Sequence, residues 1–335
     1  MLALFYIFIA VVIGVSFWQI TRILNFRTAI ATDKDNDVQG KLFLGFLAFL
    51  YAMMIYCLIF MNVLMLPESA SIEGEHDDRL FNITFILIGV VQFLMQFLLF
   101  YFSFKYRGKK ENKALFYADS HKLEAIWTIT PAVVLVVLIG YGLWQWNNIM
   151  DLSDAENPLI IEVYSKQFQW EARYAGDDNA LGRGNVNYIK GINTMGVDMT
   201  DVNAQDDKQV TEIHLPKGRK VIFKFRSQDV LHSAYMPHFR AQMNCVPGMV
   251  TEFGFTPKFT TEEMRVQSEV VEKTAVINKI RKEKGEDPYV FDFILLCNKI
   301  CGASHYGMQM KIVVEEEEAF NKWISQQPTL GEVIK

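Results

Sequence analysis

With 335 residues, the chain is long enough for two domains of ordinary size, and its 51% hydrophobic content is high for a soluble protein. The first 150 residues hold 11 acidic and 11 basic side chains, so the net charge of −5 arises from the 27 acidic and 22 basic side chains that follow. An acidic second half argues against nucleic acid as a partner, because phosphate binding needs a positive surface.

Four apolar runs dominate the first 150 residues. Each is long enough to cross a bilayer as a helix, which takes about 20 residues, and they cover residues 2–24, 42–66, 82–104 and 126–147. Four such runs disfavour the alternative of buried helices in a large soluble core. The first run has no basic residue before it and no small-residue cleavage site after it, which indicates a retained helix rather than a signal peptide. The sequence therefore predicts a membrane anchor over residues 1–150.

The loops between these runs predict the orientation through their Lys and Arg content. The loops after the first and third runs are basic, whereas residues 67–81 contain five acidic residues and a single basic one, Arg79. Because basic loops stay on the cytoplasmic side, we expect the N-terminus and residues 151–335 on the outer side.

Glu124 lies at the cytoplasmic edge of the fourth run, and Pro131 within the run is expected to kink the helix. A carboxylate at the bilayer boundary is either a solvated residue at a helix end or a group that handles protons. The position of Glu124 relative to the apolar run, taken alone, favours the solvated interpretation.

Short alternating segments replace the long apolar runs after Trp146. Such segments are typical of an antiparallel β-sandwich, with strands expected at residues 159–164, 168–174, 210–215, 221–225, 289–295 and 310–314. Residues 176–208, rich in Gly, Asn and Asp, are predicted to be a long surface loop. Residues 260–284 are predicted to be an inserted helix, and the acidic run 315–318 to begin another. The outer domain is thus expected to span residues 151–335.

Cys297, Cys301, His305 and Met308 form the strongest chemical pattern in the chain. Thiolate and thioether ligands select copper(I), zinc or iron–sulfur, and a methionine disfavours structural zinc. Two cysteines in one loop allow two copper ions to be bridged, whereas a mononuclear blue-copper centre needs only one. The alternative, two buried free thiols or a strained disulfide, would make His305 and Met308 a coincidence.

A binuclear centre needs a second imidazole from outside this loop. His232, at a strand end beside a loop, can reach ligands on a neighbouring strand. His214 is interpreted as a packing residue and His238 as a surface residue. Cys57 and Cys245 lie outside the ligand pattern, and both are expected to be buried.

Residues 297–308 resemble the CuA loop of cytochrome c oxidase subunit II, and residues 121–131, 229–233 and 246–248 match that family in the same chain order. The resemblance implies a cupredoxin-like Greek-key domain on a membrane anchor in a bacterial inner membrane, with the outer domain in the periplasm. It also implies a binuclear copper centre, CuA. Such a subunit accepts electrons from a cytochrome c and passes them to the haem–copper catalytic subunit I.

The resemblance assigns the copper ligands by position: His232, Cys297, Cys301, His305, Met308 and the backbone carbonyl of Lys299. Glu124 matches the carboxylate at the mouth of a proton path into subunit I, which raises that interpretation above the solvated one. The partners implied are subunit I, other oxidase subunits, membrane lipid, and a cytochrome c or cytochrome c domain, either free or within a larger respiratory complex.

The chain departs from the family at several positions. Lys299 stands where a glutamate usually helps to hold Mg²⁺ against subunit I, and a lysine only donates hydrogen bonds, so that magnesium site is in doubt. Phe168 stands where a tryptophan usually receives electrons, with Trp170 two positions later. The first two helices and the insertion at 260–284 are additions to the family core. These changes predict an altered docking surface for the electron donor.

Two other functions compete with an oxidase subunit. A membrane-anchored copper-delivery or assembly protein needs exchangeable surface ligands and has no use for the motif at 121–131. A structural subunit of the quinol oxidase type lacks the cysteines of the CuA loop. The sequence has no haem-attachment Cys-x-x-Cys-His motif and no histidine in the four apolar runs, so haem and the oxygen-reducing copper are expected in a partner subunit.

Overall fold

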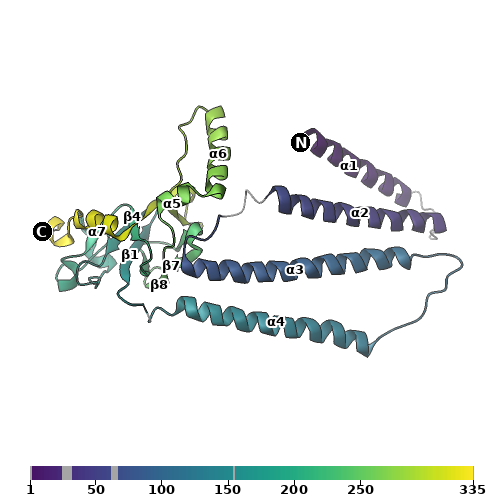
Figure 1. Ribbon diagram of the computed structural model, residues 1–335, viewed down its shortest axis with the longest axis horizontal. Helices are drawn as coiled ribbons and strands as arrows, with labels where there is room; N and C mark the ends of the chain where they lie inside the picture. The colour runs from purple at the N-terminus through teal and green to yellow at the C-terminus, as the bar shows by residue number, and fades with distance from the viewer. Residues whose placement is uncertain (1, 25–31, 62–66, 154, 335) are drawn as a thin grey trace. The chain divides into compact units, whose positions relative to one another are not determined.

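The computed structural model describes residues 2–24, 32–61, 67–153 and 155–334 (Figure 1). The chain divides into two compact units: Met1–Leu58 with Ile88–His121, and Ile59–Leu87 with Lys122–Lys335. The third helix therefore contributes to both units. The domain boundary at residue 150 stays a prediction.

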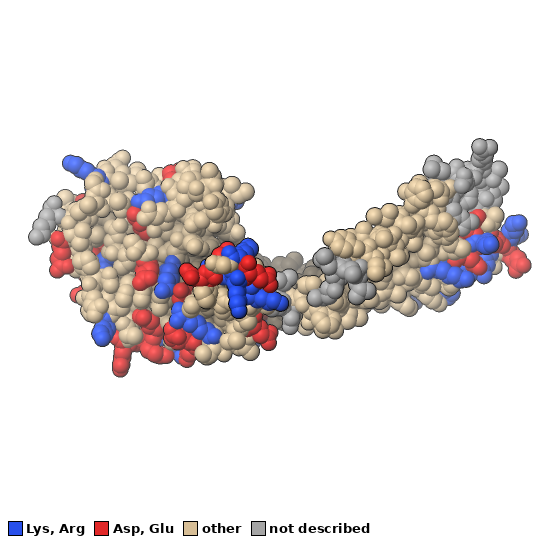
Figure 2. Space-filling view, turned by 90° about the horizontal axis from the view of Figure 1, so that it is seen from above, with Lys and Arg blue, Asp and Glu red and all other residues tan. Residues whose placement is uncertain are grey.

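Four helices precede the sandwich: α1 Leu2–Leu24, α2 Asp33–Phe60, α3 Ile72–Lys105 and α4 His121–Met150. Among the described residues, α2, α3 and α4 are long and apolar enough to cross a membrane. The apolar stretch of α1, Tyr6–Thr21, is shorter, so a fourth crossing stays a prediction. On the face shown in Figure 2, uncharged side chains cover most of the helical part.

Two of the membrane helices begin about ten residues before their apolar runs, because their first turns are polar. Asp33 and Asp35 open α2, and Glu73 and Glu75 open α3. Acidic side chains stabilise a helix N-terminus, so the apolar runs mark the membrane core rather than the helix ends. The last residues of the predicted run 42–66 lie outside the described residues. The expectation for Cys57 is wrong: it is exposed on α2, where lipid or another chain can cover an apolar side chain.

Ten strands form two five-stranded sheets, with orders β3-β2-β1-β5-β8 and β4-β10-β9-β6-β7. The strands are β1 Leu159–Lys166, β2 Gln169–Tyr174, β3 Lys208–Val210, β4 Ile213–Pro216, β5 Val221–Ser227, β6 His232–Met236, β7 Ala241–Cys245, β8 Thr251–Phe255, β9 Phe293–Cys297 and β10 Gln309–Glu315. The predicted fold class, a helical membrane anchor with an all-β domain, is confirmed. The sheets are mixed rather than purely antiparallel, because β1 pairs parallel with β5 and β10 parallel with β4.

Residues 210–215 do not form the single strand that their alternation predicts. β3 ends at Val210 in the first sheet, and β4 begins at Ile213 in the second, so the chain changes sheets between them. The sequence pattern also fails to predict β6, β7 and β8. β6 lies between β9 and β7 with four of its five residues buried, so it shows no polar alternation.

The core lies between the two sheets, and the inward-facing strand residues form it. Its members include Ile161, Val163, Phe223, Phe225, Phe293 and Leu295. Residues 176–208 are not simply the surface loop predicted, because Met195, Val197 and Ala204 are buried against Tyr164 and Leu330. Tyr164 lies on β1, so this segment covers part of the first sheet.

Four short helices complete the second unit: α5 Thr261–Arg265, α6 Ser268–Glu283, α7 Glu317–Ser325 and α8 Leu330–Val333. A capping box opens α5, where the side chains of Thr260 and Glu263 each accept from the other's backbone amide. The segment 260–284 thus forms two helices rather than one.

Residues 67–71, here called the strap, join the end of α2 to α3 and run through the second unit. Ser69, Ala70 and Ser71 have no exposed surface. The amide of Ala70 donates to the carbonyl of His238 at 2.7 Å, and the amide of Lys258 donates to the carbonyl of Ala70 at 2.8 Å. The strap is therefore hydrogen-bonded into the β-sandwich.

Candidate metal centre

Two adjacent strand ends and one loop supply every predicted copper ligand. His232 begins β6 and Cys297 ends β9, and these strands pair with Ala234 opposite Cys297. The connection from β9 to β10 carries the remaining donors, and the amide of Cys297 donates to the carbonyl of Met308 at 3.1 Å, which closes the loop. The sheet register therefore fixes which side chains meet.

The predicted donors converge on one spot. The sulfur of Cys297 lies 3.9 Å from that of Cys301 and 3.8 Å from Nδ1 of His232. Nδ1 of His305 and Sδ of Met308 lie 3.6 Å and 3.9 Å from the Cys301 sulfur. The carbonyl oxygen of Lys299 lies 3.2 Å from the Cys297 sulfur. The sulfur–sulfur distance is about twice that of a disulfide, about 2.05 Å.

Four of the donor side chains are buried and His305 is half-buried, and their chemistry fits a soft cation. His232 and Met308 are 0% and 1% exposed, and Cys297 and Cys301 are 9% and 6% exposed. Burial, together with the neighbouring Cys297, raises the pKa of the Cys301 thiol to about 11. A metal ion would displace such a proton. Since thiols, imidazoles and a thioether all offer lone pairs, the residues fit copper, and His232 with the two cysteines forms a metal-holding group.

Asp229 supports the first histidine, a role that the sequence prediction missed. Nε2 of His232 lies 2.9 Å from Oδ1 of Asp229, which favours a proton on Nε2. The unprotonated Nδ1 then faces the sulfur of Cys297. The amide of Gln167 donates to Oδ2 at 2.7 Å. Burial raises the pKa of Asp229, but hydrogen bonds from His232 and from backbone amides outweigh burial and hold the pKa below its usual value. The only signal in the sequence is its place within residues 229–233.

Phe168 and Trp170, the predicted electron-accepting contacts, lie beside the donor cluster. Nε1 of Trp170 donates to the carbonyl of Met308 at 3.4 Å, and its ring meets that of His232 edge-on at 6.2 Å. Phe168 packs on Gly302, where an added Cβ would lie 2.8 Å from the ring. The side chain of Gln167 donates to the carbonyl of Cys301 and so ties this turn to the metal loop.

The other singled-out residues lie away from the cluster. His214 is buried and stacks on Trp323 at 3.8 Å, as expected of a packing residue. Cys245 is fully buried, as predicted, and burial raises its pKa to about 12. His238 is not a surface residue: the rings of Phe291 and Phe293 lie against it, and burial lowers its pKa to about 4.

Glu124 lies in the first turn of α4, at the opposite end from the β-sandwich. It precedes the last residue of α4 by 26 positions, which corresponds to about 39 Å along a helix. This separation exceeds the hydrocarbon thickness of a bilayer, about 30 Å. Glu124 and the donor cluster are therefore far apart in the second unit.

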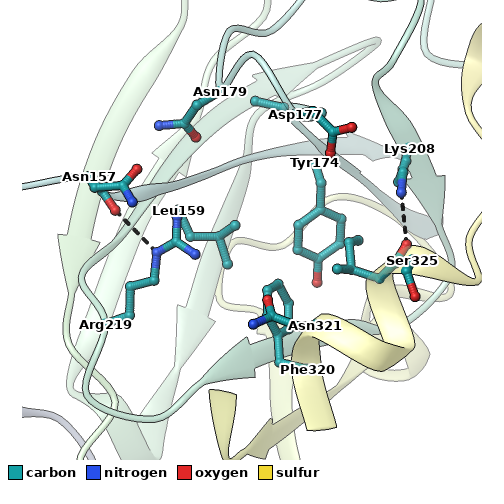
Figure 3. Close-up of a pocket in the computed structure, with 13 residues that line it drawn as sticks. Asn157, Leu159, Tyr174, Asp177, Asn179, Lys208, Arg219, Phe320, Asn321 and Ser325 are labelled. Atoms are coloured by element: carbon teal, nitrogen blue, oxygen red, sulfur yellow. Dashed lines mark hydrogen bonds between the residues drawn. The ribbon is translucent and has the colours of Figure 1, made fainter. Parts of the chain in front are cut away.

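The cavity drawn in Figure 3, of about 610 Å³, lies between Tyr174 and α7 and includes none of the predicted donors. Its two basic side chains are already engaged. Lys208 donates to the carbonyl of Ile324 at 2.9 Å, and Arg219 to that of Asn157 at 3.1 Å. The donor cluster thus remains the strongest candidate site.

Comparisons with known proteins identify relatives of the chain. Residues 60–143 match the family described as cytochrome c oxidase subunit II, transmembrane domain. The alternative cytochrome c oxidase subunit 2 of Bradyrhizobium diazoefficiens is 32% identical over 261 residues, 77% of this chain and 82% of that protein. Cytochrome c oxidase subunit 2 of Thermostichus vulcanus is 22% identical over 292 residues, 80% of each chain. The crystal structure of the periplasmic domain of cytochrome oxidase subunit II from Bradyrhizobium japonicum covers 52% of this chain and 95% of that chain, at 20% identity and a TM-score of 0.32.

The fold and the donor cluster define a class: membrane proteins that carry a two-sheet β-domain with a copper-type ligand set. Within this class, 32% identity over most of both chains places the sequence in a family. The chain belongs to the cytochrome c oxidase subunit II family, whose members here are subunits of an oxidoreductase.

Proposed function

We propose that this chain is subunit II of a cytochrome c oxidase, which accepts electrons from a cytochrome c donor at a binuclear CuA centre and passes them to the haem–copper subunit I. The number of converging donors carries this proposal. Two four-coordinate ions that share two bridging thiolates need six donors, whereas one ion needs four. Five side chains and the Lys299 carbonyl make six.

Copper bound there would supply one-electron redox chemistry. Cys297 and Cys301 would bridge the ions, and His232, His305, Met308 and the Lys299 carbonyl would complete the ligand set. His232, Met308 and the two cysteines are buried, His305 is half-buried, and Asp229 fixes the ring of His232. Such a largely buried site favours electron transfer over the alternative of copper delivery, because a carrier needs ligands that a partner can reach.

The test is metal analysis and electron paramagnetic resonance of the full-length chain, purified in detergent and loaded with copper. We expect two copper ions per chain and a spectrum in which one unpaired electron is shared by both nuclei. One copper per chain, or a spectrum from a single localised copper, would contradict the proposal. Neither measurement depends on oxidase activity.

For the membrane arrangement, we propose four crossings within residues 1–150, with the N-terminus and residues 151–335 in the periplasm of a bacterial inner membrane. The length of α4 supports this, since it is enough to put Glu124 on the cytoplasmic side at the mouth of a proton path. Lys299 is exposed and cannot ligate Mg²⁺. We therefore propose that the interface with subunit I lacks this magnesium ligand.

The surface of the metal loop supports a dedicated donor, a cytochrome c or a cytochrome c domain held in a larger respiratory complex. Ile300 and Tyr306 are 88% and 91% exposed, and Lys299 adds a positive charge beside them. A basic, freely diffusing cytochrome c is steered by acidic side chains. A donor held nearby has a high effective concentration and needs little steering.

A further inference from the structure

A second cavity, of about 530 Å³, lies in the second unit where the outer ends of α3 and α4 meet β7 and β8. This volume is within the usual range of ligand sites, roughly 300–1,000 Å³. Its walls include the apolar side chains of Trp146, Met243 and Phe253 and the polar side chains of Asp77 and Gln145. None of the predicted copper ligands lines it.

Gln145 gives this cavity an unpaired hydrogen-bond donor. Its side chain is 4% exposed, and within the described residues its buried Nε2 has no hydrogen-bond partner. Buried polar groups are nearly always paired, because an unpaired one loses its hydrogen bonds to water without replacement. Since Gln145 lines the cavity, a hydrogen-bond acceptor placed there would complete it.

Asp77 gives the cavity an acceptor and a negative charge. Within the described residues, no ion pair within 4 Å and no hydrogen bond engages its carboxylate. Arg240 also lines the cavity, but it forms an ion pair with Asp78. Its Nε and Nη2 donate to the two carboxylate oxygens of Asp78, each at 2.8 Å. Arg240 and His76 lie close enough to attract Asp77 electrostatically, but no described side chain pairs with its carboxylate, which can still accept from a bound cation.

The position of the cavity indicates the surroundings of that ligand. Leu80 and Gly142, which also line it, lie near the outer ends of two helices that can cross a membrane. Trp146 is 62% exposed beside them. Exposed tryptophans at such helix ends mark the headgroup level of a bilayer.

We propose that this cavity binds the headgroup of an aminophospholipid from the outer leaflet. The ammonium group donates to the carboxylate of Asp77, and a phosphate or ester oxygen accepts from Nε2 of Gln145. The acyl chains lie along the apolar surface of α4. A phosphatidylglycerol headgroup has no ammonium and would bring its phosphate charge close to Asp77, so the site discriminates between the two lipids.

The test uses the intact oxidase complex, stripped of lipid in detergent and resupplied with equal amounts of phosphatidylethanolamine and phosphatidylglycerol. The retained lipids are quantified by mass spectrometry. For the natural chain we expect retention of phosphatidylethanolamine over phosphatidylglycerol by about tenfold or more, as for one charge-assisted hydrogen bond. Asp77→Asn should remove this preference, whereas Asp119→Asn, in the loop between α3 and α4, should keep it.

Gln145→Leu tests the second contact. This substitution removes the Nε2 donor, whose proposed partner is a phosphate or ester oxygen present in both lipids. We therefore expect lower retention of both lipids and an unchanged ratio between them. Gln92→Leu, on α3 away from the cavity, is the matched control. If Gln145→Leu does not assemble, the ratio in Asp77→Asn decides alone. An unchanged ratio in Asp77→Asn, or no retained phospholipid in the natural complex because a partner subunit fills the cavity, would overturn the proposal.

Discussion

The β-sandwich contains two buried polar clusters that differ in charge balance. One pairs basic with acidic side chains, and the other brings together potential metal ligands. One lies on the first sheet, where Arg173 pairs with Glu162 at 2.7 Å and with Asp207 at 2.5 Å, and Arg226 also pairs with Glu162. Two guanidinium groups thus face two carboxylates. The other is the metal cluster, in which the converging atoms are all electron-pair donors.

The difference separates a structural cluster from a functional one. In the ion-pair cluster, burial raises the pKa of Glu162, but Arg173 and Arg226 outweigh burial, so that its pKa is lowered and the charges balance within the chain. The metal cluster has no cation of its own, and Cys301 keeps a raised pKa beside Cys297. A cation that displaces the thiol protons would supply the positive charge that this cluster lacks.

The largest effect is expected from Cys301→Ser, which removes one of the two cysteines proposed to bridge the copper ions. A hydroxyl is a poor copper ligand, so copper binding and the shared-electron spectrum should both be lost. Metal analysis and electron paramagnetic resonance measure this. Cys245→Ser is the control, because Cys245 is buried outside the donor set. Loss of copper in the control would show that the ligand assignment is wrong.

Arg173→Leu breaks the self-balanced cluster and should act on stability rather than on copper. It leaves Glu162 and Asp207 with one fewer positive charge, and removing one partner of a buried ion pair costs about 3–5 kcal/mol. Arg183→Leu is the control: Arg183 is 73% exposed and pairs with Asp198 and Asp201, where a loss of about 0–1 kcal/mol is expected. Denaturant unfolding of the solubilised chain measures both. Equal losses in the two variants would remove the distinction between the clusters.

Glu124→Gln tests whether the membrane end of α4 acts independently of the metal cluster. A neutral amide keeps the shape but cannot carry a proton, so turnover should fall by about tenfold or more. The copper spectrum should not change, because Glu124 lies at the end of α4 that is farther from the β-sandwich. Glu111→Gln, in the loop before α4, is the matched control. Oxygen consumption at the parent rate would mean that Glu124 is a solvated residue at a helix end.

Asp229→Asn should weaken the metal cluster without destroying it. The carboxylate that orients His232 is lost while all six donors remain, and such a change typically costs about 10- to 100-fold in metal affinity. Titration with a copper chelator measures the affinity. Asp292→Asn is the control, since Asp292 pairs with Arg265. Unchanged affinity would show that the sheet register alone positions His232.

The smallest expected effect is that of salt on electron transfer from a generic basic cytochrome c. With the positive charge of Lys299 beside the donor cluster and Phe168 in place of the usual tryptophan, turnover should be slow and should change by less than about twofold as ionic strength rises. Steady-state oxidation by the purified complex measures it. Fast turnover at low salt that collapses at high salt would show that ordinary electrostatic docking persists.

Patterns within short stretches of sequence predicted the ligand loop and the membrane helices. The loop with Cys297 and His305 holds most of its ligands within a few residues, and apolar length alone marks α2 to α4. Apart from the contact of His232 with the 297–308 loop, which the family resemblance implied, most contacts between distant segments escaped prediction. The role of Asp229 is apparent only once the fold brings it beside Gln167. The environment of His238 likewise depends on the rings of Phe291 and Phe293, which lie against it.

The strap has a consequence for the biosynthesis of the protein. Ala70 is hydrogen-bonded to both His238 and Lys258, so the sandwich closes around a segment that precedes it by more than eighty residues. In the proposed topology, that segment must already have been translocated when the strands fold. If α2 and α3 were inserted in the opposite orientation, the strap would lie on the cytoplasmic side. The loop between β9 and β10 would then form in a domain that lacks this segment. The strap is therefore part of the folded domain, and a fragment of residues 151–335 would lack a buried segment around which the sandwich closes.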